Sequence, residues 1–217
     1  MEKIQKEFYA SFYSQIVKSS YNSLGHRIMH SLMERSMSDK YFDKVVELGV
    51  GDNQHLKYVK HKYNSFVGLD LRFAEELRGN FINADVLNIP IKNKSVDRVI
   101  VTCLLHHLGN PVQALKEIKR VVNEDSNFNV TILVPCDPGF LYRMIRIKTQ
   151  HTMKRLGITN PSLIHYLEHV GSYPAIDNMI RYVFQDHKVH KRNYPFIINS
   201  WNFNLFSVFS IHNKKEK

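Results

Sequence analysis

The stretch 45–51, Val-Val-Glu-Leu-Gly-Val-Gly, constrains the fold more than any other part of the chain. Its β-branched and aliphatic residues predict a buried strand, and the glycines predict a turn directly after it. Glycine lets a backbone turn sharply and approach a ligand closely, because no Cβ stands in the way. A helix beginning near Asn53 would present free N–H groups to the same ligand. The pattern therefore predicts a nucleotide-binding loop.

A second predicted strand, 66–70, ends in Asp70. This carboxylate follows the glycine loop by about twenty residues, the spacing from which an acid can hold both hydroxyls of a ribose. A carboxylate at this point favours an unphosphorylated ribose over a phosphorylated one. Dinucleotide-binding sheets share this arrangement, but the third glycine of their G-x-G-x-x-G pattern is missing here.

Three further stretches, 83–86, 95–102 and 104–108, follow in order. With the glycine loop and Asp70, they resemble the motif order of class I S-adenosylmethionine-dependent methyltransferases over residues 45–135. The resemblance implies an α/β fold with a doubly wound, mostly parallel sheet of Rossmann-like methyltransferase type. It also implies S-adenosylmethionine as the cofactor.

In that family the glycine loop faces the methionine part of the cofactor, the acid after the second strand binds the ribose, and an Asp–hydrophobic pair after the third strand holds the adenine. The cofactor-binding residues that the resemblance implies are Glu47, Gly49, Gly51, Asp70, Leu71, Asp85, Val86 and Thr102. Asn53 stands where many members have a third glycine. Because Asn tolerates left-handed backbone geometry better than most residues, we expect the loop to keep its shape.

Each of these residues also has a purely structural explanation. The glycines could be ordinary turn residues, Asp70 a solvent-exposed carboxylate at a strand end, and Asp85 a turn former. Their joint occurrence in the family's order favours the cofactor site. For Asp97, before the fourth strand, the structural explanation is favoured: it is expected to shape the preceding turn.

The 217 residues, of which 43% are hydrophobic, fit a single domain over 1–217. Within it we expect a helical flap over 1–43, where Leu24, Ile28 and Leu32 recur at helical spacing, and a cofactor-binding core over 44–136. In the core, Asn110 and Pro111 predict a helix start, and 128–134 predicts the fifth strand.

The chain after the core departs from the alternation of strands and helices. We expect a helical insert after the fifth strand, an acceptor lid over 137–186, and C-terminal strands over 187–217.

The N-terminus is charged and amphipathic, and no apolar run reaches membrane-spanning length, so neither a signal peptide nor a membrane span is predicted. Cys103 and Cys136, at the ends of the fourth and fifth predicted strands, are expected to be buried free thiols. These features favour the cytoplasm.

The formal net charge is +10, from 30 basic and 20 acidic side chains. Basic residues cluster at 143–155 and 188–192. An anionic acceptor, an acidic lipid surface or RNA would explain both clusters, and so would solvation alone. Nucleic acid is not favoured, because most basic residues are dispersed and are not interleaved with aromatic stacking platforms. Arg143 and Arg146, at i, i+3 spacing, are the candidates to contact an anionic acceptor.

His106 and His107 follow the fourth predicted strand, in a segment that borders the acceptor pocket in many related methyltransferases. They are the candidate catalytic bases, although at least one of them is expected to pack or hydrogen-bond structurally. The pairs His26–His30 and His165–His169 have the i, i+4 spacing of metal ligands. Neither pair has an adjacent Glu in zinc-protease order, and the cysteines form no C-x-x-C, so no metal site is predicted.

The mechanism implied by the resemblance is an in-line displacement at the sulfonium methyl, for which positioning of the acceptor is the protein's main task. Residues 137–142 and 194–206 are similar to uncharacterised methyltransferases associated with surface-polysaccharide gene clusters. We therefore expect a small, anionic acceptor, a sugar or surface-polysaccharide precursor, with O-methylation favoured. The alternatives are a quinone, lipid or RNA methyltransferase and, from another class, a non-catalytic cofactor-binding or nucleic-acid-binding protein. The oligomeric state is not predicted.

Overall fold

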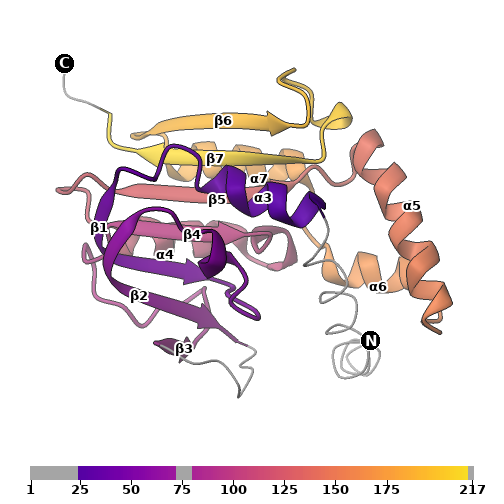
Figure 1. The fold of residues 1–217 in the computed structure, drawn as a ribbon, viewed down its shortest axis with the longest axis horizontal. Helices are drawn as coiled ribbons and strands as arrows, with labels where there is room; N and C mark the ends of the chain where they lie inside the picture. Colours follow the sequence, from indigo (N-terminus) through magenta and orange to yellow (C-terminus); the bar gives the residue numbers. More distant parts are fainter. Residues whose placement is uncertain (1–23, 72–79, 215–217) are drawn as a thin grey trace.

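The computed structural model describes residues 24–71 and 80–214 of the chain (Figure 1). Its strands are β1 (Tyr41–Leu48), β2 (Lys62–Asp70), β3 (Phe81–Asn83), β4 (Arg98–Thr102), β5 (Asn129–Pro135), β6 (Lys188–Tyr194) and β7 (Phe206–His212). Its α-helices are α3 (Leu24–Met33), α4 (Pro111–Val121), α5 (Phe140–Arg155), α6 (Pro161–Glu168) and α7 (Tyr173–Val183). Three short 3₁₀ turns are η2 (His55–Tyr58), η3 (Leu105–His107) and η4 (Trp201–Phe203).

The strands form one sheet in the order β3-β2-β1-β4-β5-β7-β6. The first five strands in this order are parallel, and β7 and β6 complete the sheet in antiparallel pairings. The predicted doubly wound, mostly parallel sheet is therefore confirmed. Because parallel strands share a direction, the ends of β1, β2, β4 and β5 meet at one edge, where open α/β sheets bind ligands.

Side chains alternate between the two faces of the sheet, as the period of a strand requires. Figure 1 shows α4 and α7 on one face and α3 on the other. Val46, Leu48, Val99 and Val101 pack on the α4–α7 face, whereas Val45, Ile100 and Leu133 pack on the α3 face.

Local signals set the boundaries of α4 and β5. The side-chain Oδ1 of Asn110 accepts a hydrogen bond of 3.1 Å from the backbone N–H of Gln113, and Pro111 occupies the first turn, as predicted. Strand β5 begins and ends one residue later than the predicted strand over 128–134. Helix α3 confirms the expected helix around Ile28, whereas residues 1–23 of the expected flap lie outside the described residues.

Two details differ from the sequence-based expectation. We expected a helix beginning near Asn53, but the segment 49–61 between β1 and β2 contains only the 3₁₀ turn η2. This segment has no apolar helical face to pack on the sheet, and its buried residues are His55 and His61. The expected lid over 137–186 also includes α7, whose Ile176 and Ile180 are fully buried against the sheet. Only α5 and α6 are left as candidates to cover the acceptor.

A buried carboxylate connects α3 to the sheet. Glu34, directly after α3, is completely buried and is ion-paired with Arg98 of β4. Its carboxylate also accepts hydrogen bonds from His55 Nε2 at 3.1 Å and His61 Nδ1 at 2.9 Å. Burial alone would raise the pKa of Glu34, but the hydrogen bonds from both histidines and the charge of Arg98 outweigh it and lower the pKa. The network thereby holds α3 and the segment after the glycine loop against β4.

We expect Glu34→Gln to lower the free energy of unfolding by about 3–5 kcal/mol, because it leaves the buried Arg98 charge unpaired. Urea denaturation followed by circular dichroism measures this change. The exposed Asp39→Asn serves as control and should stay within about 0.5 kcal/mol of the wild type. Because the pKa of Glu34 is lowered on folding, its contribution is present above its ordinary value of 4.5 and is lost as the pH falls below it. A variant as stable as the wild type at neutral pH would contradict the role of this network.

Candidate cofactor and acceptor site

The loop after β1 has the backbone that its glycines were expected to provide. Gly49, Gly51 and Asn53 all have positive φ, of 69°, 49° and 56°. A Cβ on Gly49 would lie 2.9 Å from Leu104 Cδ1 and would displace that side chain, and the positive φ would strain any residue other than glycine at this position. Asn53 adopts the left-handed geometry predicted for it.

Asp70, the last residue of β2, lies against this loop. Its Oδ2 accepts a hydrogen bond of 2.9 Å from the backbone N–H of Gly51. The Gly49 N–H donates to the Leu69 carbonyl at 2.8 Å. These bonds fix the loop and the acid relative to each other at the sheet edge, where Leu71 follows with an exposed side chain.

Glu47 has a buried carboxylate with an unpaired oxygen. The residue is 2% exposed, and its Oε2 has no hydrogen-bond partner among the described residues. Burial, and then the negative charges of Glu34 and Asp70, raise its pKa well above the ordinary value. A carboxylate in this position fits a cationic ammonium group, such as that of the methionine part of the expected cofactor, because a bound cation would supply the missing partner.

Asp85 and Val86 follow β3 as predicted, and Asp85 also has a structural role. Its Oδ1 accepts a hydrogen bond of 2.9 Å from the Leu87 N–H, which closes the turn after the strand. Val86 is buried. At the end of β4, the Thr102 hydroxyl donates to the Met33 sulfur at 3.4 Å. Asp85 and Thr102 thus each have a structural hydrogen bond, and both lie at the sheet edge where the cofactor is expected.

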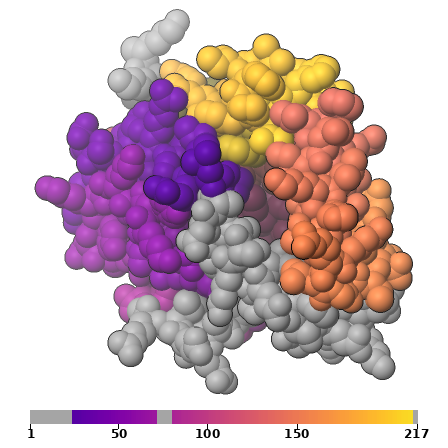
Figure 2. Space-filling model, turned by 45° about the vertical axis from the view of Figure 1, so that its right-hand side comes forward, coloured from indigo at the N-terminus to yellow at the C-terminus, as the bar shows by residue number. Residues whose placement is uncertain are grey.

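The segments after β4 and β5 carry the residues predicted for the acceptor. Figure 2 shows residues 24–71 (indigo to violet) and the helices α5 and α6 (orange) as two separate masses on opposite sides of the molecule. The glycine loop lies at the ends of β1 and β2, and η3 follows β4 directly. The residues predicted for the cofactor and those predicted for the acceptor therefore come from neighbouring strands at one edge of the sheet.

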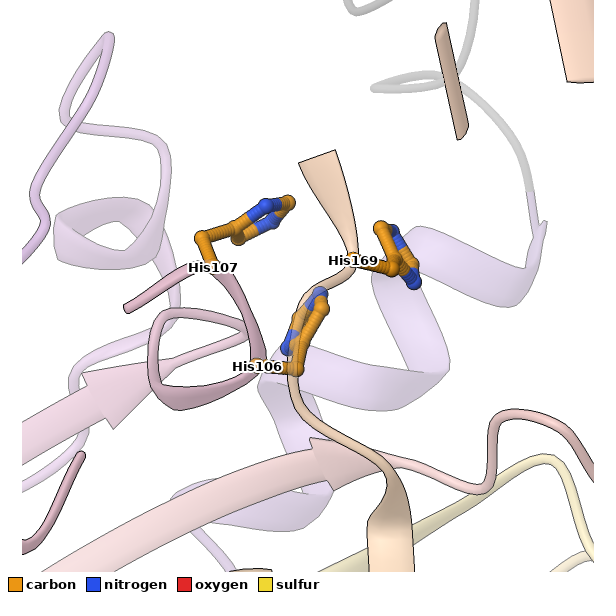
Figure 3. Close-up of side chains that lie close together, drawn as sticks. All are labelled: His106, His107 and His169. Atoms are coloured by element: carbon orange, nitrogen blue, oxygen red, sulfur yellow. The ribbon is translucent and has the colours of Figure 1, made fainter. Parts of the chain in front are cut away.

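His106 and His107 of η3 lie beside His169, which follows α6 (Figure 3). The ring centroids of His106 and His107 are 4.0 Å apart, and those of His106 and His169 are 4.4 Å apart. His106 is 3% exposed, and its Nδ1 has no hydrogen-bond partner among the described residues. Burial, together with the neighbouring imidazoles of His107 and His169, lowers the pKa of His106 well below its ordinary value.

His107 is the better placed of the two predicted bases. Its side chain is 31% exposed, and its Nδ1 lies 2.7 Å from the backbone carbonyl oxygen of Glu168. Because a carbonyl oxygen can only accept, Nδ1 carries a proton and donates it in this hydrogen bond. His106 is the member of the pair that packs structurally.

Asp137, two residues after β5, brings the predicted pair His165 and His169 together. Its Oδ2 lies 2.8 Å from His165 Nε2 and 2.9 Å from His169 Nδ1. Burial would raise the pKa of Asp137, but the hydrogen bonds from both histidines lower it. Along the sequence, Asp137 has only the pattern of a turn, because Pro138 and Gly139 follow it. The signal that could have identified it is its place after β5, at the ligand-binding edge of the sheet.

The two arginines chosen for an anionic acceptor have different surroundings. Arg143 is exposed on α5. Arg146 Nη1 lies 3.8 Å from Asp137 Oδ1, and its guanidinium carbon lies 5.5 Å from the centre of the Tyr166 ring. Arg146 therefore faces the histidines and Asp137, and Arg143 lies on the outer surface of the same helix.

The start of α5 is held tightly. A Cβ on Gly139 would lie 2.6 Å from the Cys136 carbonyl oxygen and 2.8 Å from that of Trp201. The Phe140 N–H donates to Asn202 Oδ1 at 3.3 Å. This end of the helix is thus packed against η4.

The two cysteines are free, as predicted, but only Cys136 is fully buried. Burial raises the pKa of both Cys103 and Cys136 to about 12, so neither is a thiolate at neutral pH. Among residues 24–71 and 80–214, no helix combines the length and apolar character needed to cross a bilayer.

Comparison with known proteins adds independent findings. Residues 46–129 match a family model described as a methyltransferase domain. The chain is 30% identical over 136 residues to an uncharacterized protein of Methanocaldococcus jannaschii. This match covers 58% of the chain and 51% of the relative, so the chain spans about half the length of the curated protein that it matches.

Solved structures with the same fold cover nearly the whole chain. A Thermotoga maritima structure, described as a SAM-dependent methyltransferase and possible histamine N-methyltransferase, has a TM-score of 0.63 at 16% identity. It matches over 99% of this chain and 100% of its own. The plantazolicin methyltransferase BpumL, solved with SAH, has a TM-score of 0.64 at 13% identity, over 97% of this chain and 94% of its own. At these identities the likeness establishes the fold.

Glu47→Gln should stabilise the protein without cofactor, because the amide carries no charge into the buried site. We expect a rise in the free energy of unfolding of about 1 kcal/mol or more at pH 8. In the wild type the raised pKa of Glu47 makes stability fall as the pH rises above 4.5, and the variant should lose that slope. Urea titrations at several pH values, with the exposed Asp125→Asn as control, measure the effect. An unchanged pH slope would show that the Glu47 carboxylate is paired.

Proposed function

We propose that the chain is a class I S-adenosylmethionine-dependent methyltransferase that transfers the methyl group of this cofactor to a small acceptor; the match of residues 46–129 to a methyltransferase domain supports this. One observation carries the proposal beyond the family match. Gly51, Asp70 and the buried carboxyl group of Glu47, whose Oε2 has no hydrogen-bond partner among the described residues, lie together at the ligand-binding edge of the sheet. A loop fixed in this way beside a buried carboxyl group suits a ligand that combines a cation with a ribose, because the cation would stabilise the charged form of Glu47.

The proposed cofactor contacts follow the order of the strands. Glu47 holds the ammonium group of the cofactor, Gly49 and Gly51 let its methionine part approach the backbone, and Asp70 and Leu71 hold the ribose. The adenine contacts Asp85 and Val86, and Thr102 closes the site on the side of α3. When bound, the cofactor supplies an electrophilic methyl group together with its leaving group.

The acceptor is proposed to lie between η3 and α5–α6, within reach of His107. For a hydroxyl acceptor, His107 Nε2 takes the proton while Nδ1 keeps its hydrogen bond to the Glu168 carbonyl. His106 supports this arrangement by packing against His107, 4.0 Å between ring centroids. The protein's remaining work is to align the acceptor and keep water away from it.

The charge of α5 supports an anionic acceptor, such as a sugar or surface-polysaccharide precursor, with O-methylation favoured. Helix α5 carries no acidic residue, and its basic residues are Arg143, Arg146, Lys148, Lys154 and Arg155. Arg146 is the inner contact, because its guanidinium faces Asp137, and Arg143 is the contact at the rim. A positively charged wall of this kind attracts anionic acceptors before they bind.

A lipid-linked or quinone-like acceptor is the second candidate, and the apolar surface beside this charge favours it. Phe140, Met144 and Ile147 recur at helical spacing on α5 and are 59%, 53% and 61% exposed. The nearby loop before η4 adds Ile197, which is 98% exposed. Basic and apolar side chains on one surface are typical of proteins that lie on anionic lipid surfaces.

Cofactor binding tests the core of the proposal. Isothermal titration calorimetry should show one site that binds both S-adenosylmethionine and S-adenosylhomocysteine. Asp70→Ala should weaken binding by about 1–3 kcal/mol, because it removes charge-assisted hydrogen bonds to the ribose and to the Gly51 N–H. The matched control is Asp43→Ala, at the far end of β1, which should bind as the wild type does. Absence of binding by the wild type would refute the proposal.

Mass spectrometry with a methyl-labelled cofactor and a cell extract would identify the acceptor. Label in the water-soluble fraction supports the anionic metabolite, and label in the organic fraction supports the lipid. With the acceptor known, His107→Ala should lower the single-turnover rate by about 10²–10⁴-fold and leave cofactor affinity unchanged. His151→Ala, an exposed histidine on α5, is the control. Equal rates in wild type and His107→Ala would leave positioning as the whole mechanism.

A further inference from the structure

We propose that Asp137, His165 and His169 form a binding site for one divalent transition-metal ion beside the acceptor pocket. The three side chains come from two places in the chain: Asp137 from the turn after β5, and the two histidines from the end of α6 and the residue that follows it. The fold thus brings together a carboxylate and two imidazoles that no local motif connects.

The donor atoms already lie close to metal-binding geometry. Asp137 Oδ2 is 2.8 Å from His165 Nε2 and 2.9 Å from His169 Nδ1, and one ligand atom from each residue lies within 4.8 Å of the others. Ligands at about 2.0–2.2 Å from a tetrahedral zinc ion are separated by about 3.3–3.5 Å. Displacements of about half an ångström would therefore open a space for the ion. The side chains are 10–14% exposed, so few rotamers compete with this arrangement.

Unsatisfied polar atoms around the three ligands are a second, independent observation. His106 is 3% exposed, its ring lies 4.4 Å from that of His169, and its Nδ1 has no hydrogen-bond partner among the described residues. Asp137 Oδ1 also has no hydrogen-bond partner there, although Arg146 lies 3.8 Å away. A buried imidazole nitrogen is costly to leave without a hydrogen-bond partner, and a bound ion would accept the lone pair of the neutral ring.

The ligand set decides which ions the site takes. Two imidazoles with one carboxylate suit Zn²⁺, Fe²⁺, Co²⁺ or Ni²⁺, whereas Mg²⁺ and Ca²⁺ prefer oxygen ligands alone. His106 and His107 form a second group with His169, also within 4.8 Å. His106 is thereby the nearest candidate for a fourth ligand, and Arg146 orients the outer oxygen of Asp137.

The location of the site suggests its use, and this step rests on the proposed function. The ligands lie between the ends of β4 and β5 and the inner side of α5, where the acceptor is proposed to bind. A metal ion with an open coordination position would hold an oxygen of the acceptor there and lower the pKa of a bound hydroxyl. It would supplement His107 in preparing the acceptor.

Metal content and affinity test the site directly. The full chain should be purified without a polyhistidine tag, since a tag binds the same ions, then stripped with a chelator and titrated with Zn²⁺. We expect one ion per chain with a dissociation constant below about 1 µM. Asp137→Asn, His165→Ala and His169→Ala should each weaken binding by at least about 100-fold, whereas His151→Ala should not. Variants that bind S-adenosylhomocysteine as the wild type does are folded.

Cobalt provides a second measurement that does not depend on affinity. Co²⁺ bound by the wild type should give the strong visible absorption of a tetrahedral site, and His169→Gln should lose or shift these bands. Zinc binding weaker than about 100 µM, or equal binding by the wild type and all three ligand variants, would overturn the proposal. If the protein binds the metal ion but not the cofactor, the metal site stands and the proposed function is refuted. If it binds the cofactor but not the metal ion, only the metal site is refuted.

Discussion

The buried carboxylate of Glu34 is the interaction on which the rest of the structure depends. It joins α3 to Arg98 of β4, and through His55 and His61 it also holds the segment that follows the glycine loop. That segment has no helix of its own to anchor it to the sheet. The position of the loop, and hence of every cofactor contact proposed for it, therefore depends on a charge network at the opposite end of the same connection.

The edge of the sheet is divided between two kinds of chemistry. The ends of β1 and β2 present carboxylates and glycines, which suit a ligand with a cation and a ribose. The ends of β4 and β5 present imidazoles together with Asp137, which suit proton transfer or a metal ion. Because all four strands are parallel neighbours, the two sets lie side by side, and a transferred group has only a short distance to cross.

The sequence predicted the features that depend on local pattern: the core strands along the chain, the glycine turn, the left-handed Asn53 and the cap at Asn110. It also indicated that His165 and His169 share a helix face. It could not show that Asp137 is their common partner, because 28 and 32 residues separate them and only the fold brings them together. Likewise, only burial distinguishes His106 from His107, and the Glu34 network has no signature along the chain.

Gly139 packs tightly against the Cys136 and Trp201 carbonyls, so a side chain at this position would have to displace backbone atoms. With the Phe140 hydrogen bond to Asn202, this packing fixes the first turn of α5 against η4. At the C-terminal end of α5, Gly157 and Asn160 have positive φ of 85° and 57°, and the chain turns there into α6. The proposed lid is thus anchored at its start and turns sharply into α6 at the other end. If the lid holds the acceptor as proposed, a change in length at this corner would alter the size of the acceptor that fits and leave the cofactor half of the edge intact.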